Sequence, residues 1–276
     1  MYHIDGWLTA CYSLEAMTII TLLTDFGLKD GYVGVMKGVI WGIAPRAQLA
    51  DITHQIQPQN VAEGALALGR VAPYFPAGTI HLAVVDPGVG TRRRPIAARL
   101  GEQFFVGPDN GLCTVLVEQA RQAEAVTQFV HLDQPHYWLP EISNVFHGRD
   151  IFSPVAAHLA NGTPLSELGS PIQDPRQLEF PPPERFGTGW RGVVMHVDAF
   201  GNLATNLERQ HIPAGNRLTI KIGGVQIERL AATFGEGEAN QLMALFDSAG
   251  KLSICVVNGS AADRLKIDIG APVEVL

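Results

Sequence analysis

The sequence predicts an α/β N-terminal domain with a mainly parallel sheet, followed by a smaller all-β C-terminal domain folded as a barrel or sandwich. Three observations lead to this prediction. Strand-like apolar runs alternate with helical apolar spacing in the first part of the chain, prolines accumulate in the middle, and short alternating segments separated by glycine turns follow. We therefore expect the N-terminal domain at residues 18–169, a proline-rich linker at 170–189 and the C-terminal domain at 190–276.

The composition fits two domains and excludes several classes of protein. The chain has 276 residues, of which 46% are hydrophobic, so each domain can bury a core of its own. A formal net charge of −7 speaks against binding to nucleic acid, and no apolar run is long enough to predict a membrane-spanning helix. Three distant cysteines, Cys11, Cys113 and Cys255, form neither a CxxC motif nor a disulfide framework, which favours a reducing cytoplasm.

Residues 1–17 are expected to be a disordered extension. Residues 1–16 have neither a basic start nor an unbroken apolar core, so they do not resemble a secretion signal. Because the first convincing strand starts just after Met17, we suspect an upstream extension or a misplaced start codon. We expect residues 1–16 to be dispensable.

The N-terminal domain begins with a βαβαβ pattern. Its strands are rich in β-branched residues, and its helices carry apolar residues at helical spacing. The expected elements are a strand at 18–23, a helix at 31–43, a strand at 48–52, a helix at 60–72 and a strand at 80–85. Such a pattern predicts a parallel, buried sheet.

The remaining elements follow from alternation and turn residues. Before the linker we expect a hairpin at 96–100 and 103–106, a strand at 125–132 and a helix from 151 that ends at Asn161-Gly162. In the C-terminal domain we expect strands at 192–197, 217–222, 225–229, 252–257 and 272–275.

Acidic residues stand where two of the parallel strands end. Asp25 follows the first strand, and Asp86 follows the strand at 80–85 and precedes a Pro87-Gly88 turn and three arginines at 92–94. Ligands of open α/β sheets bind in the crevice outside the carboxyl ends of the strands. This edge of the sheet is therefore the predicted site.

The residue types at this edge suit proton handling near a charged small molecule. Asp86, one of the arginines at 92–94 and His147 supply a carboxylate, a permanent cation and an imidazole. There is no Gly-x-Gly-x-x-Gly after the first strand and no Walker-type sequence, so phosphates are not bound in the usual ways. His147 and His158 lie about three helical turns apart, which disfavours a metal site.

Six motifs, spread in order over both domains, resemble the S-adenosylmethionine hydroxide adenosyltransferase family, which is related to the fluorinases and chlorinases. They are Thr24-Asp-Phe-Gly27, Val85-Asp-Pro-Gly-Val-Gly-Thr91, Gly107-Pro-Asp-Asn-Gly111, Phe146-His-Gly-Arg-Asp150, Asp198-Ala-Phe-Gly-Asn202 and Asn258-Gly-Ser260. The resemblance implies a hydrolase that splits S-adenosylmethionine into adenosine and methionine by attack of water at the ribose C5′. It also implies a homotrimer with the site between subunits, and no cofactor or metal.

By this resemblance Asp86, Arg93 and His147 form a triad that positions and polarises a water or hydroxide. Arg93 is chosen because the family's arginine stands seven positions after its aspartate, while Arg92 and Arg94 are expected to be solvated or ion-paired. Asp25 resembles the acid that accepts hydrogen bonds from both ribose hydroxyls, although it could instead cap the following helix.

The C-terminal domain is expected to supply the other substrate contacts. Asp198, Phe200 and Asn202 resemble residues that hold the methionine ammonium and the adenine, and Val256 and Asn258 fall where backbone groups read the adenine edge. Ser248 matches a serine that binds the methionine carboxylate, although Ala249 stands where the halogenases place an arginine. The strand containing Val256 would be part of the core in any case.

Water, rather than halide, is the expected nucleophile. The halogenases carry tyrosine in place of both Asp86 and His147, and the fluoride-binding serine of the fluorinases corresponds to Gly148. A carboxylate repels an anion and is suited to accept a proton from water. A halogenase, a catalytically silent S-adenosylmethionine or adenosine sensor, and an unrelated metal phosphohydrolase remain the alternatives.

Overall fold

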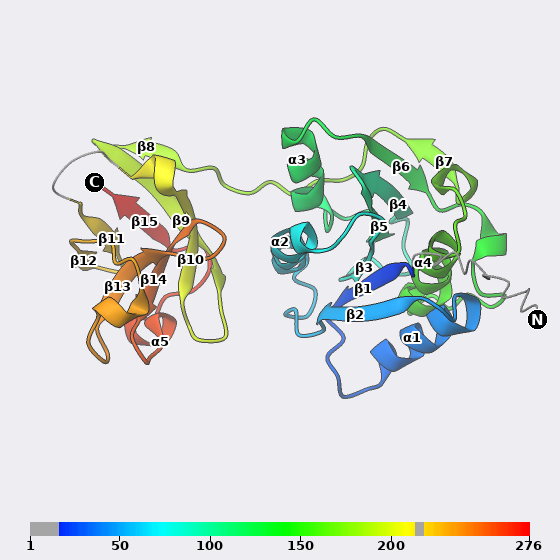
Figure 1. Ribbon diagram of the computed structural model, residues 1–276, viewed down its shortest axis with the longest axis horizontal. Helices are drawn as coiled ribbons and strands as arrows, with labels where there is room; N and C mark the ends of the chain where they lie inside the picture. Colours follow the sequence, from blue (N-terminus) through cyan, green and yellow to red (C-terminus); the bar gives the residue numbers. More distant parts are fainter. Residues whose placement is uncertain (1–16, 213–217) are drawn as a thin grey trace, which may run out of the picture. The chain divides into compact units, whose positions relative to one another are not determined.

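The computed structural model describes residues 17–212 and 218–276 (Figure 1). The chain divides into two compact units, with the boundary in the sequence between Leu178 and Glu179. Residues 1–16 of the extension predicted at 1–17, and the start of the strand predicted at 217–222, lie outside the described residues.

The N-terminal unit is an α/β fold around a seven-stranded sheet. The strand order is β2-β1-β3-β5-β4-β6-β7. The strands are β1 (Ile19–Thr24), β2 (Gln48–Thr53), β3 (Ile80–Val84), β4 (Pro95–Leu100), β5 (Gln103–Pro108), β6 (Thr127–His131) and β7 (Ser170–Ile172). Neighbours from β2 to β5 are parallel, whereas β4 is antiparallel to β5 and β6, and β7 to β6. Five of the seven strands thus run in one direction, which confirms the predicted class.

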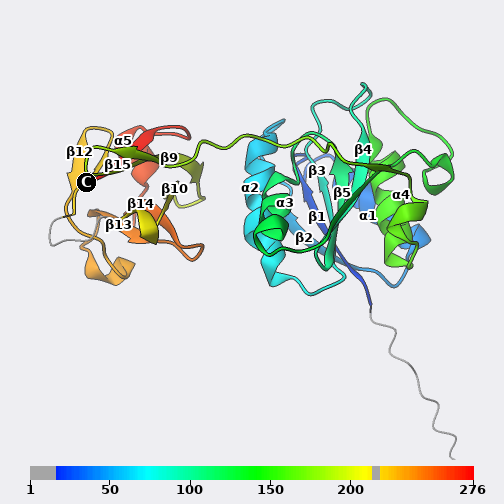
Figure 2. The same cartoon turned by 90° about the horizontal axis from the view of Figure 1, so that it is seen from above.

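Helices cover both faces of this sheet. They are α1 (Tyr32–Ile43), α2 (Val61–Val71), α3 (Thr114–Gln122) and α4 (Ser153–Ala160), with a one-turn π-helix, Gly148–Phe152, leading into α4. Figure 2 shows α1 and α4 on one face and α2 and α3 on the other. All five residues of β3 are buried, as expected for a central strand covered on both sides. None of the described helices is long and apolar enough to cross a membrane.

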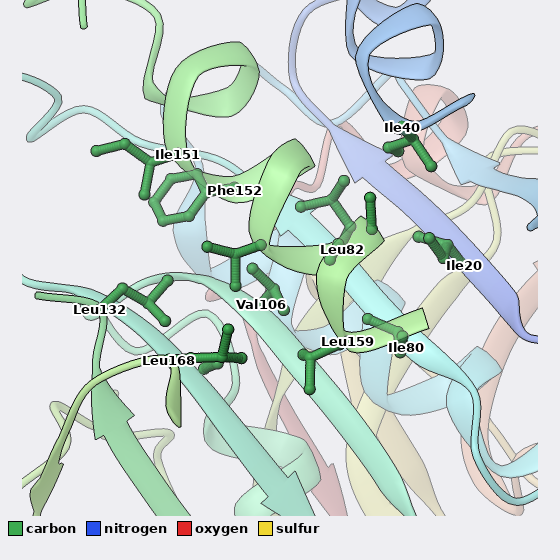
Figure 3. Close-up of a cluster of buried hydrophobic side chains, with 14 of the residues drawn as sticks. Ile20, Ile40, Ile80, Leu82, Val106, Leu132, Ile151, Phe152, Leu159 and Leu168 are labelled. Atoms are coloured by element: carbon green, nitrogen blue, oxygen red, sulfur yellow. The ribbon is translucent and has the colours of Figure 1, made fainter. Parts of the chain in front are cut away.

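Two apolar clusters, one on each face, hold these layers together. The cluster on the α1 and α4 face is drawn in Figure 3, where Phe152 and Leu159 lie among strand residues such as Leu82 and Val106. On the opposite face, Leu68 of α2 and Leu116 of α3 pack with Phe105 and other strand residues. The two clusters fix the strands whose carboxyl ends carry Asp25 and Asp86.

Two parts of the N-terminal unit differ from the sequence prediction. Helix α3 was not predicted, although its buried residues Leu116, Val117 and Ala120 have helical spacing. The segment predicted as a linker at 170–189 contains β7, which pairs with β6. Pro171 fits there because β7 is an edge strand, and one side of an edge strand has no neighbouring strand to which its backbone N–H groups must donate.

The C-terminal unit is an antiparallel, nearly barrel-shaped β fold, as predicted. The strand order is β12-β11-β15-β9-β10-β14-β13, with β8 paired to β9. Its elements are β8 (Glu184–Phe186), β9 (Gly189–Val197), β10 (Leu203–Glu208), β11 (Ile220–Ile222), β12 (Val225–Ile227), β13 (Leu242–Phe246), β14 (Lys251–Val256), β15 (Pro272–Val275) and α5 (Ala261–Leu265). A bridge between Leu230 and Ala244 brings the chain after β12 to β13, so the two edges of the sheet meet. Strands β8, β10 and β13 and helix α5 were not predicted.

Short 3-10 turns complete the described structure of both units. They lie at Ala72–Tyr74, Pro135–Tyr137, Leu165–Glu167, Arg209–His211 and Phe234–Glu236.

Candidate functional site

The parallel pairing of β1 and β3 places Asp25 and Asp86 at the same edge of the sheet. Thr24 pairs with Val84, and the two acids follow these residues at the carboxyl ends of the strands. Both residues are partly buried. This is the edge at which open α/β sheets bind ligands.

Asp86, Arg93 and His147 form one cluster at this edge. Arg93 Nε donates to Asp86 Oδ1 at 3.0 Å, and Arg93 Nη2 donates to Asp86 Oδ2, so the ion pair is bidentate. Arg93 Nη2 also lies 3.3 Å from His147 Nδ1. The Asp86 and Arg93 side chains are only 5% and 7% exposed, so water screens the pair little. The guanidinium carbon of Arg93 lies 5.3 Å from the centre of the Phe152 ring.

The surroundings of His147 favour its neutral form. Burial lowers the pKa of His147, the adjacent Arg93 cation lowers it further, and the Asp86 and Asp150 carboxylates oppose this shift. Since arginine can only donate hydrogen bonds, Nδ1 of a neutral His147 accepts from Arg93, which leaves the proton on Nε2. An N–H donor of His147 is thus available to a ligand.

Arg93 also has an uncommitted donor. Its Nη1 is buried and has no hydrogen-bonding partner within residues 17–212 and 218–276. A buried N–H group without a partner is costly, typically by about 1–3 kcal/mol and more for a charged group. A ligand oxygen placed here would remove that cost.

Gly90 allows the two segments of the cluster to approach each other. It has φ +73°, and a Cβ built on it would lie 2.2 Å from the carbonyl oxygen of Asn144, in the segment that leads to His147. Only glycine satisfies both the positive φ and this close approach. The glycine therefore brings the Arg93 loop against the His147 segment.

The buried carboxylate of Asp150 organises the segment around His147. It accepts hydrogen bonds from the Ser143 backbone N–H at 2.8 Å and from Arg149 Nε at 2.5 Å. Burial raises the pKa of Asp150, but the hydrogen bonds from Arg149 and Ser143 outweigh it and hold the pKa below its usual value. Asp150 thus remains charged and fixes the loop that precedes the π-helix.

The other two arginines take the roles expected of them. Arg94 pairs with the buried Asp109 at 2.7 Å and with Asp174 at 2.9 Å. Arg92 is exposed. Neither forms part of the Asp86 cluster in the described structure.

Asp25 is held by a residue that the sequence analysis missed. The backbone N–H of Gln59 donates to Asp25 Oδ2 at 2.8 Å, and Gln59 has φ +68°, a conformation that non-glycine residues rarely adopt. The N-cap of α1 is Gly31 and carries no side-chain capping bond, so Asp25 does not cap that helix. No pattern in the sequence indicated the conformation of Gln59.

In the C-terminal unit, Asp198, Phe200 and Asn202 share one tight loop. Asp198 Oδ1 accepts from the backbone N–H groups of Phe200 and Asn202, both at 2.9 Å, and Oδ2 accepts from the Asn202 side chain at 2.8 Å. The Phe200 side chain is 78% exposed. Asp198 therefore shapes the loop, and the Phe200 ring is exposed on it.

The other predicted contacts lie at the two ends of β14. Asn258 follows this strand, and Ser260, two residues later, packs against the Asp198 loop, because a Cβ on Gly201 would lie 2.0 Å from Ser260 Oγ. Ser248 is exposed in the turn before β14, at the opposite end of the strand. Val256 is 6% exposed with its side chain in the core, so it can offer a ligand only backbone groups. Only a ligand extended along β14 could contact both Ser248 and Asn258.

No cluster suited to a metal ion occurs where the structure is described. Within those residues no three His, Cys, Asp or Glu side chains are arranged to hold one. His158 instead packs against Tyr137, with ring centres 5.0 Å apart.

Comparison with known proteins links both units to one family. Residues 20–169 match the model of the SAM hydroxide adenosyltransferase N-terminal domain, and residues 192–274 match that of the C-terminal domain. A relative from Thermus thermophilus named (R)-S-adenosyl-L-methionine hydrolase is 40% identical, covering 94% of this chain and 100% of its own. One from Salinispora tropica with the same name is 38% identical, covering 93% and 97%.

A solved structure and a more distant relative complete the comparison. A conserved protein from Thermotoga maritima has a TM-score of 0.85 and 36% identity, covering 93% of this chain and 100% of its own. A relative named fluorinase, from Nocardia brasiliensis, is 27% identical, covering 93% and 96%.

Proposed function

The chain belongs to the S-adenosylmethionine hydroxide adenosyltransferase family, and from this premise we propose that it hydrolyses S-adenosyl-L-methionine to adenosine and L-methionine. The observation that carries the proposal is the buried Asp86–Arg93–His147 cluster with its unpartnered Arg93 donor, which lies at the same sheet edge as Asp25. The cluster offers a permanent cation, a carboxylate and a neutral imidazole to one small ligand. This set suits the activation of water.

The chemistry needs a positioned nucleophile more than an acid. The oxygen of water forms a bond to the ribose C5′ while the C5′–S bond breaks and its electron pair stays on sulfur. The sulfonium becomes a neutral thioether, so its departure needs no proton. Catalysis then consists of holding water in line with the C5′–S bond and stabilising the charge that it develops.

Each member of the proposed triad has a distinct task. Arg93 Nη1 donates to the attacking oxygen and stabilises hydroxide character on it, and the His147 Nε2–H orients the same oxygen. Asp86 holds the guanidinium through both oxygens, and its remaining lone pairs can accept the proton that water loses. His147 must stay neutral for this arrangement, which agrees with its lowered pKa.

Substrate binding is proposed to use both units. Asp25 has one oxygen, Oδ1, free of the Gln59 bond and directs its carboxylate to the ribose hydroxyls. Phe200 and Asp198 would receive the adenine and the methionine ammonium, with the backbone near Val256 and Asn258 at the adenine edge. Asn202 supports the Asp198 carboxylate, and Ser248 would bind the methionine carboxylate.

We also propose, from the family resemblance, a homotrimer in which the N-terminal unit of one subunit and the C-terminal unit of a neighbour form the site. Light scattering should then give a mass three times that of the 29.8 kDa chain. Trimers assembled from both Asp86→Asn and Phe200→Ala subunits should be more active than trimers of either variant alone, because some sites would combine two intact halves. A monomer, or mixtures that stay inactive, would refute this arrangement.

Turnover in ¹⁸O-labelled water tests the function. We expect the label in the 5′-hydroxyl of adenosine, and no 5′-halo-adenosine at a significant fraction of this rate even in molar chloride. Asp86→Asn, Arg93→Lys and His147→Gln should each lower kcat by about 10²–10⁴-fold, the usual contribution of a positioned acid–base group. The matched control is Arg92→Lys, an exposed arginine in the same loop, which should leave kcat unchanged.

Three outcomes would contradict the proposal. Halogenated nucleoside as the main product would indicate a halogenase. Tight binding of S-adenosylmethionine without turnover would indicate a sensor. Wild-type activity in all three triad variants would move the chemistry elsewhere.

A further inference from the structure

The dipeptide Asp109-Asn110, which follows β5, is bonded to both ends of the loop that carries Asp86 and Arg93. At the start of the loop, Asn110 Nδ2 donates to the carbonyl oxygen of Val85 at 2.8 Å. At its end, the Asp109 backbone N–H donates to the carbonyl oxygen of Arg94 at 2.9 Å. Residues 86–93 therefore form a loop whose stem is closed by two adjacent residues of another strand end.

The side chain of Asp109 reinforces the second of these contacts. Its Oδ2 accepts from Arg94 Nε at 2.8 Å, and its Oδ1 accepts from the Arg176 backbone N–H at 2.7 Å. The side chain is only 2% exposed, so water competes little for these bonds. Asp109 thus fastens Arg94 from both its backbone and its side chain.

The amide of Asn110 is held in one orientation. Its Oδ1 accepts from the Leu112 backbone N–H at 3.2 Å, which directs the Nδ2 donor towards Val85. Val85 is fully buried, so a water molecule cannot readily replace Asn110 as the donor to its carbonyl oxygen. Losing the Asn110 donor would leave a buried acceptor without this partner.

These contacts bear on the site because Asp86 and Arg93 are the first and last residues of the braced loop. Their bidentate geometry requires the two ends of the loop to keep a fixed separation. We propose that Asp109 and Asn110 are positioning residues, which set the geometry of the Asp86–Arg93–His147 cluster by closing the loop stem. This inference rests on the function proposed above for that cluster.

A positioning role predicts a specific kinetic pattern. A displacement of about 1 Å in a reacting group can cost about 10²-fold in rate. We expect Asp109→Asn and Asn110→Ser to lower kcat by about 10-fold to 100-fold. KM for S-adenosylmethionine should change by less than about 3-fold, because the proposed binding groups are Asp25 and the C-terminal unit.

The two variants are chosen to preserve local structure. Asn has the shape of Asp but lacks its charge, and Ser can keep the turn bond to Leu112 although it is too short to reach Val85. The matched control is Asp174→Asn, because Asp174 also pairs with Arg94 at 2.9 Å, yet its side chain is 79% exposed and lies outside the loop stem. The control should keep the wild-type kcat.

A second readout uses the unliganded protein and does not depend on turnover. Proton NMR can follow the titration of His147, assigned by the peak that is missing in His147→Gln. Arg93, Asp86 and Asp150 are the charged groups that act on His147, and burial and Arg93 lower its pKa. If the stem loosens, the pKa of His147 should rise towards its ordinary value in Asp109→Asn and Asn110→Ser, and stay unchanged in Asp174→Asn.

The combined outcomes separate this inference from the proposed function. A lower kcat together with an altered His147 titration supports the positioning role of Asp109 and Asn110. If the wild-type protein does not hydrolyse S-adenosylmethionine, the proposed function fails, but an altered His147 titration in the variants still supports the positioning role. An unchanged titration in folded variants overturns it, whether or not their melting temperature or kcat falls. If Asp109→Asn fails to fold, Asn110→Ser decides the question by the same criteria.

Discussion

Replacing Gly90 by alanine should lower kcat strongly, and by much more than a loss of unfolding free energy alone would cause. Gly90 has φ +73°, where an alanine costs about 1–2 kcal/mol. The added Cβ would also lie 2.2 Å from the Asn144 carbonyl oxygen, against roughly 3.3 Å for a normal carbon–oxygen contact, so one segment must move by about 1 Å. That displacement separates the Arg93 loop from the segment of His147, and we expect kcat to fall by about 10²-fold.

Gly78 provides the matched control for this experiment. It has nearly the same φ, +80°, but a Cβ there would meet no atom within 4 Å. Gly78→Ala should therefore lose about 1–2 kcal/mol of unfolding free energy and keep its kcat. Urea unfolding and initial rates of S-adenosylmethionine hydrolysis measure the two quantities. Wild-type kcat in Gly90→Ala, or an equal loss of kcat in Gly78→Ala, would refute the reasoning.

Two further predictions concern buried titratable groups outside the Asp86–Arg93–His147 cluster. Burial lowers the pKa of His81, so below about pH 6.5 the unfolded chain binds more protons than the native protein. The free energy of unfolding should therefore fall with falling pH in this range, by up to about 1.4 kcal/mol per pH unit. His81→Gln should flatten the stability profile between about pH 7 and 5, and an equal slope in both proteins would contradict this account. Burial also raises the pKa of the Cys113 and Cys255 thiols to about 12, so iodoacetamide at pH 8 should label them only after denaturation, as peptide mass spectrometry would show. Labelling of either thiol in the native protein would count against the described burial.

The elements that the sequence predicted correctly are those whose signals are local. The apolar run of β3 and the helical spacing of α1 and α2 each depend on residues close in the chain. Turn and strand propensities also placed Asp25 and Asp86 at strand ends. Because both strands were expected to be parallel, the shared edge followed from sequence.

Helix α3 and strand β7 are elements that local sequence signals did not predict. Residues 108–111 carry a strong turn signal, whereas the helical spacing that follows them covers only nine residues. The prolines after residue 169 favoured a linker, whereas pairing of β7 with β6 draws Pro171 into the sheet edge. In both places tertiary packing outweighs a weak or contrary local preference.

The sequence by itself determined the class of both units, the strand ends that carry acids, and the residue types of the proposed triad. The tertiary structure decided how Arg93 bonds to Asp86 and His147, how Gln59 holds Asp25, and that Asp109 and Asn110 close the loop stem. Propensity and periodicity act over a few residues, whereas these contacts join residues 7 to 54 positions apart through directional hydrogen bonds. Their partners depend on the register and packing of the whole sheet, which no short stretch of sequence specifies.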